Sequence, residues 1–132
     1  MYDLSSRLME GYDVIPSTPV LLRFSNLHTN FVILHWDPPA RHGETVTHYE
    51  LVTLQLSPTP GKVITYPDVQ PPHILENLGP KSTYEVHVKA VNDFGVGSPS
   101  SRLVFRTRSK HTEFLADIFE DEKAGQKKHN MT

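Results

Sequence analysis

The sequence predicts an all-β domain in which two antiparallel sheets pack face to face. Short runs of alternating apolar and polar residues recur along the middle of the chain, and turn-forming residues separate them. All 11 prolines and five of the seven glycines lie between Pro16 and Pro99, where the turns of such a domain would fall. No segment within this stretch has the apolar spacing of a helix, so a two-sheet sandwich is favoured over a mixed fold.

The distribution of proline divides the chain into three parts. The 132 residues are enough for one domain with short extensions. We expect a lead segment at 1–15, a folded body at 16–108 and a tail at 109–132, because both ends lack proline and carry a different residue pattern.

Composition argues against several classes of protein. Thirteen Lys and Arg against fifteen Asp and Glu give a net charge of −2, which argues against nucleic-acid binding. The chain has no cysteine, so it has neither a disulfide framework nor a thiolate zinc site. No apolar run is long enough to span a bilayer, and the first residues lack the pattern of a secretory leader. We therefore expect no direct membrane insertion.

Seven segments fit the strand pattern. In the clearest one, from Tyr84 to Ala90, apolar side chains alternate with polar ones, as expected for a half-buried strand. Another ends at Trp36 and is stopped by Asp37-Pro38-Pro39, because proline has no amide to donate to a strand ladder. The expected strands are 19–24, 30–36, 46–56, 62–66, 73–78, 84–90 and 103–107, of which the fourth is weak and is fenced by Pro58, Pro60 and Pro67.

Two groups of residues make this prediction more specific. Leu78, Pro80 and Tyr84 have the spacing of a tyrosine corner, in which the phenol hydroxyl bonds to backbone a few residues upstream and pins a turn between sheets. Trp36, the only tryptophan, follows Leu34 at two-residue spacing. Its indole is therefore expected to fill the space between the sheets.

Five segments stand in an order and register typical of a known family. They are Pro19-x-x-Leu22-x-Phe24, Val32-x-Leu34-x-Trp36-Asp-Pro-Pro39, Tyr49-x-Leu51, Leu75-x-x-Leu78-x-Pro80-x-x-x-Tyr84-x-Val86-x-Val88-x-Ala90-x-Asn92 and Phe94-Gly-Val-Gly-Ser-Pro-Ser100. Together they resemble the fibronectin type III family over 16–108. The resemblance implies a seven-stranded, immunoglobulin-like β-sandwich. The chain lacks the Arg-Gly-Asp tripeptide of some integrin-binding members, since Asp93-Phe-Gly occupies that loop, and it lacks the Trp-Ser-x-Trp-Ser signature of cytokine receptors.

No residue pattern points to catalysis. No two of the eight histidines have the i, i+4 spacing of a helical zinc site, and no acidic loop matches a calcium site. Ser98, Ser100 and Ser101 lie in a turn that lacks the Gly-x-Ser-x-Gly elbow of a serine nucleophile. We expect no enzyme activity, no bound metal and no cofactor.

The first candidate contact surface lies on the strand that carries the tryptophan. If Leu34 and Trp36 face inward, Phe31 and Ile33 point outward, where family members commonly carry polar residues. Two large apolar side chains there form a candidate contact patch for a protein. The alternative is that neighbouring strands or the lead segment cover them.

The second candidate lies on loops at one end of the sandwich. Family topology implies that Arg41 and His42 share that end with Asp93 and Phe94. Binding residues concentrate on loops that a rigid scaffold holds in place. Phe94 is the residue there that is best suited to contact a partner.

The third candidate is in the tail, where residues 113–124 are predicted to form a short amphipathic helix that ends at Gly125. One side is apolar and the other acidic; the apolar side consists of Phe114, Leu115, Ile118 and Phe119. An isolated helix of about twelve residues is marginal in water, so it needs a docking surface. That surface could belong to its own domain, to a neighbouring domain or to a partner, and an ordinary linker helix is the alternative.

The resemblance implies a non-catalytic protein-interaction or spacer module of a larger cell-adhesion, matrix or receptor protein. Such a module would lie outside the cell or at its surface, beside other domains, and bind a protein partner of unknown identity. The alternative is a cytoplasmic module of a cytoskeletal, muscle or synaptic scaffold, whose fibronectin domains also lack cysteine. An accessory domain of a carbohydrate-active enzyme is a third interpretation, and it would require a catalytic neighbour.

Overall fold

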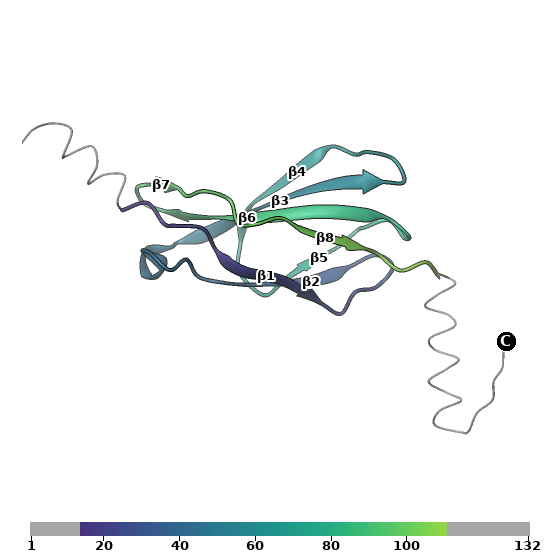
Figure 1. Ribbon diagram of the computed structural model, residues 1–132, viewed down its shortest axis with the longest axis horizontal. Coiled ribbons are helices and arrows are strands. Elements are labelled where there is room, and N and C mark those ends of the chain that lie inside the picture. Colours follow the sequence, from purple (N-terminus) through teal and green to yellow (C-terminus); the bar gives the residue numbers. More distant parts are fainter. Residues whose placement is uncertain (1–13, 111–132) are drawn as a thin grey trace, which may run out of the picture.

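The computed structural model describes residues 14–110, which form two antiparallel sheets packed face to face (Figure 1). The first sheet has the order β1-β2-β5, with β1 at Val20–Ser25, β2 at Val32–Asp37 and β5 at His73–Leu75. The second has the order β4-β3-β6-β7, and β8 also pairs with β6. Its strands are β3 (His48–Ser57), β4 (Val63–Val69), β6 (Thr83–Asn92), β7 (Gly95–Val96) and β8 (Leu103–Arg106), and a single 3₁₀ turn, η1, spans Gly43–Thr45. The predicted all-β sandwich is confirmed.

The strand β6 is the centre of the second sheet and shows the predicted alternation in full. From Thr83 to Asn92, every second side chain is buried and the residues between them are half-buried. This period of two follows from the pleat of the backbone, which sends successive side chains to opposite faces of the sheet. The buried members include Tyr84, Val86, Val88 and Ala90.

The hydrophobic core lies between the two sheets, and both contribute to it. Trp36 of β2 is 3% exposed and meets Tyr49 of β3 edge to face, with ring centroids 5.5 Å apart. Leu34 and Leu51, which neighbour these rings along β2 and β3, are fully buried. The Trp36 indole nitrogen has no hydrogen-bond partner within the described residues. Close packing therefore holds this ring in place.

The turn before β6 is pinned by the Tyr84 side chain. The Gly79 amide donates a hydrogen bond of 2.7 Å to the Tyr84 hydroxyl, as a tyrosine corner requires. The Thr107 hydroxyl donates to the Gly79 carbonyl at 2.6 Å, so the turn is also held by the residue that follows β8. Leu78 packs against the core, whereas Pro80 is exposed at the surface of the turn.

The prediction that Pro67 ends the fourth strand was wrong, because β4 continues through it to Val69. β4 is an edge strand, so a residue without an amide hydrogen can lie where no ladder bond is needed. The register with β3 shifts between Tyr49 and Leu51, opposite this part of β4.

The first and last strands differ from the simple alternation. Leu21 has a left-handed backbone (φ 56°), and the register of β1 with β2 shifts between Val20 and Arg23. Phe24 lies 5.9 Å from Phe105 between ring centroids and is still 40% exposed, because β1 is an edge strand. The chain before β8 also forms the short strand β7, which the sequence analysis did not predict.

Replacing Tyr84 with Phe is expected to lower the free energy of unfolding by about 1–3 kcal/mol, since the half-buried Gly79 amide loses its acceptor. Urea denaturation of the 132-residue chain measures this loss. Tyr66→Phe is the matched control, because the Tyr66 ring also contacts a neighbour, His73, while its hydroxyl makes no hydrogen bond within residues 14–110. Equal stability of the Tyr84 variant and the wild type would contradict the proposed role of this hydroxyl.

Candidate functional site

The loops at one end of the sandwich meet around Asn92, the last residue of β6. Figure 1 shows the described chain entering at this end, beside β7. Asn92 is only 6% exposed, because it continues the inward-facing series of β6. A buried amide must satisfy its donors and its acceptor, and here it does so with three separate segments of the chain.

Each polar atom of the Asn92 side chain binds a different part of this end. The nitrogen donates to the Val14 carbonyl at 2.7 Å and to the Thr45 hydroxyl at 3.0 Å. The oxygen accepts from the amides of Phe94 and Gly95, at 2.9 and 3.1 Å. One side chain thus fixes the entering chain, the β2–β3 loop and the β6–β7 turn relative to one another.

Further bonds hold the entering chain against the β2–β3 loop. The Ser17 amide donates to the Arg41 carbonyl at 3.2 Å, and the Arg41 amide donates to the Ser17 hydroxyl at 3.0 Å. Gly97 packs so closely on the Pro16 carbonyl that a Cβ at this position would collide with it. The loops at this end are therefore held in a fixed arrangement.

The structure brings the four predicted loop residues to this end and presents one of them prominently. Phe94 is 69% exposed at the tip of the turn, and Val96 nearby is 47% exposed. Asp93 and Arg41 are exposed as well, whereas His42 is half-buried in a left-handed conformation (φ 62°). An aromatic tip with charged neighbours has the composition of a protein-binding surface. We name Arg41, His42, Asp93, Phe94 and Val96 the loop-end site.

The predicted contact patch at Phe31 and Ile33 is not an open surface. Both residues are half-buried. The Phe31 ring stacks on His28 with centroids 4.3 Å apart, and Ile33 lies between its cross-strand partners Ser25 and Ile74. Neighbouring segments cover much of this pair, as the alternative interpretation expected.

The predicted tail residues lie outside the described part of the chain. They are Phe114, Leu115, Ile118 and Phe119.

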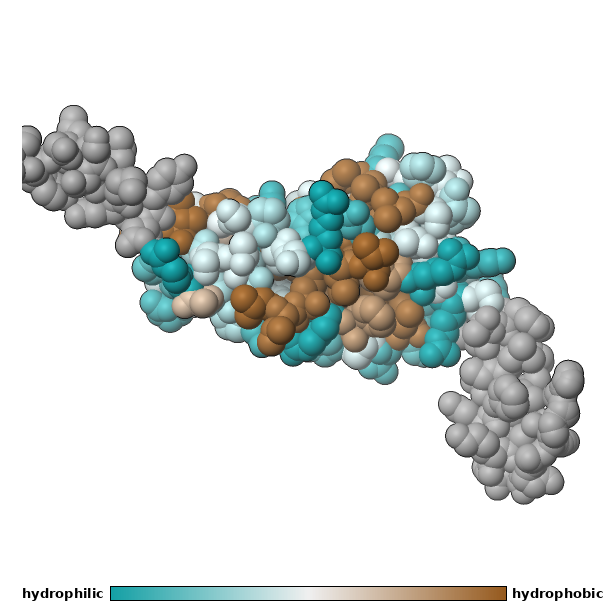
Figure 2. All heavy atoms as spheres, in the orientation of Figure 1, coloured by the Kyte–Doolittle hydropathy of each residue, from teal (hydrophilic) through white to brown (hydrophobic). Residues whose placement is uncertain are grey.

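The outer face of the second sheet carries a row of side chains that was not among the candidate surfaces predicted from the sequence. Val63, Leu54, Glu85 and Val104 stand opposite one another on four neighbouring strands. Val63 is 62% exposed and Val104 is 53% exposed. The outward positions of a strand can be read from period two, but which strands become neighbours depends on the fold. Apolar side chains also gather over β1 and β8, at the edge where the two sheets meet (Figure 2).

His87 lies on the outer face of the second sheet. Burial lowers the pKa of the His87 imidazole below its ordinary value of 6.5, and the positive charges of Lys89 and Arg102 lower it further. The Glu85 carboxylate raises this pKa, but it also pairs with Arg102 at 3.3 Å. The net direction of the pKa shift is downward.

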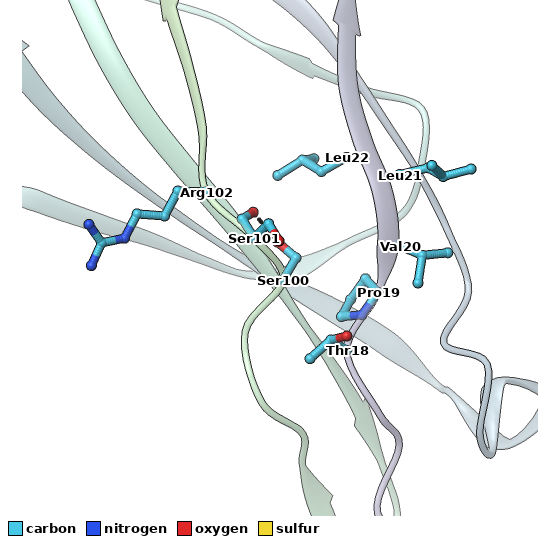
Figure 3. A pocket seen from close by; sticks show the side chains of 8 residues that line it. All are labelled: Thr18, Pro19, Val20, Leu21, Leu22, Ser100, Ser101 and Arg102. Carbon is cyan, nitrogen blue, oxygen red and sulfur yellow. Dashed lines mark hydrogen bonds between the residues drawn. The ribbon is translucent and has the colours of Figure 1, made fainter.

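A cavity of about 330 Å³ opens between β1 and the chain that leads into β8 (Figure 3). Its lining is Thr18, Pro19, Val20, Leu21, Leu22, Ser100, Ser101 and Arg102. The Ser100 hydroxyl donates to the Ser101 carbonyl at 2.9 Å and accepts from the Val88 amide at 3.0 Å, so it serves the backbone. Arg102 extends away from the cavity. This lining includes no residue that could act as a general base toward a serine.

Within residues 14–110, no group of three or more His, Cys, Asp or Glu side chains is placed to hold a metal ion. Within the same range, no helix has the length and apolar character needed to cross a bilayer.

The two antiparallel sheets, the tyrosine corner and the clustered loops define an immunoglobulin-like β-sandwich. The chain belongs to the fibronectin type III domain family, whose model matches residues 17–106. Domains of this family are generally non-catalytic.

Curated relatives share this domain within much longer proteins. The chain is 35% identical over 95 residues to phosphatidylinositol phosphatase PTPRQ of Homo sapiens, a match that covers 72% of this chain and 4% of that protein. It is 28% identical over 117 residues to Titin of Drosophila melanogaster, with 86% of this chain and 1% of that protein covered. The chain thus spans a small fraction of the length of both relatives.

Solved structures show the same fold. The third fibronectin III domain of human KIAA0343 protein aligns with a TM-score of 0.60 at 23% identity, covering 74% of this chain and 86% of that one. The FN5 domain of Drosophila Lar aligns with a TM-score of 0.59 at 20% identity, covering 72% and 99%.

Two substitutions at Asn92 should separate its roles. Asn92→Ala is expected to lower the free energy of unfolding by about 1–3 kcal/mol and to speed amide exchange at Phe94 and Gly95. Asn92→Asp keeps the acceptor for these two amides but loses the donors to Val14 and Thr45. It should therefore preserve slow exchange at Phe94 and Gly95 while it lowers stability. Unchanged exchange in the alanine variant would show that Asn92 does not hold the turn.

The lowered pKa of His87 predicts a pH dependence of stability. In the unfolded chain, His87 takes up a proton as the pH falls through its ordinary pKa of 6.5, whereas in the folded chain it does so only at lower pH. The free energy of unfolding therefore decreases as the pH is lowered through this range. His87→Gln should reduce the loss of stability between about pH 7 and pH 5.5. His73 adds to the same loss, because burial lowers its pKa as well. Urea titrations at several pH values measure the effect, and parallel curves for variant and wild type would contradict it.

Proposed function

We propose that this chain is a non-catalytic protein-interaction and spacer module of a larger cell-adhesion, matrix or receptor protein. The observation that carries the proposal is the placement of Phe94. Its ring is 69% exposed on a turn that the buried Asn92 side chain fixes. An exposed aromatic ring held on a rigid turn binds a partner at little cost in conformational entropy.

The arrangement of the two ends supports the spacer role. The described chain enters beside the loop-end site and leaves beyond β8, at the opposite end of the sandwich (Figure 1). Both ends are tied to the body: the Val14 carbonyl binds Asn92, and the Arg108 amide donates to the His28 carbonyl at 3.2 Å. Neighbouring domains attached at these points would be held apart by the length of the sandwich.

Solved structures of consecutive domains support the same interpretation. The match to domains A168–A170 of titin covers 33% of that chain, and the match to the FN1–FN3 domains of chicken CNTN1 covers 31%. Each fraction corresponds to one of three domains in a row. We propose that the body at 16–108 likewise has neighbouring domains in a longer protein.

The alternative function is a fibronectin type III module of an intracellular scaffold. The similarity to Titin over 86% of the chain favours it. The reading frame of the parent protein distinguishes the two settings. A leader and a membrane span in the parent protein would support a cell-surface location. Kinase, SH3 or immunoglobulin-like neighbours in a parent protein that has no leader and no membrane span would support the cytoplasm.

Phe94→Ser is expected to weaken capture of the partner about tenfold or more without changing the melting temperature, because the ring is exposed. Val63→Ser is the matched control, since Val63 is similarly exposed (62%) but lies on β4.

A capture experiment with the intact chain and a chain ending at Arg108 shows whether the body or the tail is recognised. Full capture by the Phe94 variant would contradict a role for the loop-end site.

A further inference from the structure

The strands β1 and β8 belong to different sheets but lie side by side at one edge of the sandwich. The rings of Phe24 and Phe105 are 5.9 Å apart, which places β1 against β8. We name this edge the β1/β8 seam. It consists of Val20, Leu21, Leu22 and Phe24 from β1 and of Leu103 and Val104 from β8.

Several apolar side chains of the seam are exposed to solvent and are not covered by the core. Phe24 stands opposite the buried Leu34 and faces the interior, yet 40% of it is exposed because no strand lies beyond β1. Val104 of β8, whose side chain lies on the outer face of the second sheet opposite Glu85, is 53% exposed. Figure 2 shows apolar side chains gathered over these two strands. A contiguous exposed apolar surface of this kind marks a place where another segment or molecule packs.

The tail of the chain begins directly beside this surface. Only residues 111 and 112 separate Lys110, the last described residue, from the predicted helix at 113–124. Twelve helical residues rise about 18 Å, and a strand rises about 3.3 Å per residue. A helix of this length that packed back along the end of β8 would cover about five strand residues, to about the level of Phe105. That is the level of Phe24 and Val104, and it falls short of Leu21.

Charge is complementary along the same path. Arg106, Arg108 and Lys110 are all exposed at the end of β8. The segment 113–122 carries five acidic residues and no basic one. These opposite charges favour a tail that lies along the end of β8 over one that extends away from it.

We propose that residues 113–124 fold back as an amphipathic helix and pack their apolar side on Phe24 and Val104 of the seam. The apolar side is the stripe formed by Phe114, Leu115, Ile118 and Phe119. A helix of this length is marginal alone, but the short connection to β8 keeps it at high effective concentration beside the seam. This inference is independent of the loop-end site, which lies at the entering end of the chain.

Hydrogen exchange of the full 132-residue chain tests the proposal. In the wild type, amides in 114–124 are expected to exchange at least about tenfold more slowly than in an unstructured peptide. The double variant Phe114→Ser/Phe119→Ser should abolish this protection and lower the melting temperature by about 4 °C or more. Ala116→Ser, on the other side of the predicted helix, is the control and should change neither.

Substitutions on the seam test the contact from the other side. Val104→Ser should increase exchange in 114–124, whereas Leu21→Ser should leave it unchanged because the helix does not reach that residue. Both side chains are exposed, 53% and 68%, so neither change should prevent folding. Raising the salt concentration should also speed exchange in the tail, since the charge attraction is screened.

Three results would overturn the proposal. Exchange in 114–124 at the unstructured rate in the wild-type chain would show that the tail is undocked. Equal effects of Val104→Ser and Leu21→Ser would place any docked tail elsewhere. Sedimentation that shows a dimer for the wild type and a monomer for Val104→Ser would assign the seam to a second copy of the chain.

Discussion

Aromatic rings that cross the gap between the two sheets hold this domain together. Trp36 meets Tyr49 at one place, and Phe24 meets Phe105 at another, so each contact joins one sheet to the other. Phe105 also stacks on Tyr84, with centroids 5.7 Å apart. Without these contacts, each sheet would expose one apolar face to water. Everything at the surface of the domain, including both candidate contact regions, depends on this packing.

The rule of alternation that builds the core also builds the loop-end site. Because Asn92 ends the inward-facing series of β6, its amide is buried and must be satisfied by nearby polar groups. It is satisfied by three segments at once, and this fixes the turn that carries Phe94. A residue in a structural position thus determines how an exposed side chain is presented to a partner.

The two candidate surfaces lie at different places for different reasons. The loop-end site exposes Phe94 because its turn projects beyond the sheets. The β1/β8 seam exposes Phe24 because an edge strand has a neighbour on one side only. A chain that enters at the loop end and leaves next to the seam can engage a neighbour at one and cover the other with its own tail. These two uses would not compete.

The sequence by itself determined the sandwich, the inward residues of β6 and the turn at Tyr84, because each follows from period two or from local turn chemistry. It did not determine that β4 would accept Pro67, since the cost of proline depends on whether the strand lies at an edge. It predicted a strand that includes Phe24, and only the tertiary structure showed that this strand lies at an edge, where Phe24 stays 40% exposed. The hydrogen bonds of the Asn92 side chain could not be predicted from the sequence either, because they join segments as far apart in the chain as Val14 and Gly95. Local periodicity gives the direction of a side chain, whereas the neighbours that it meets are decided only when distant strands pack.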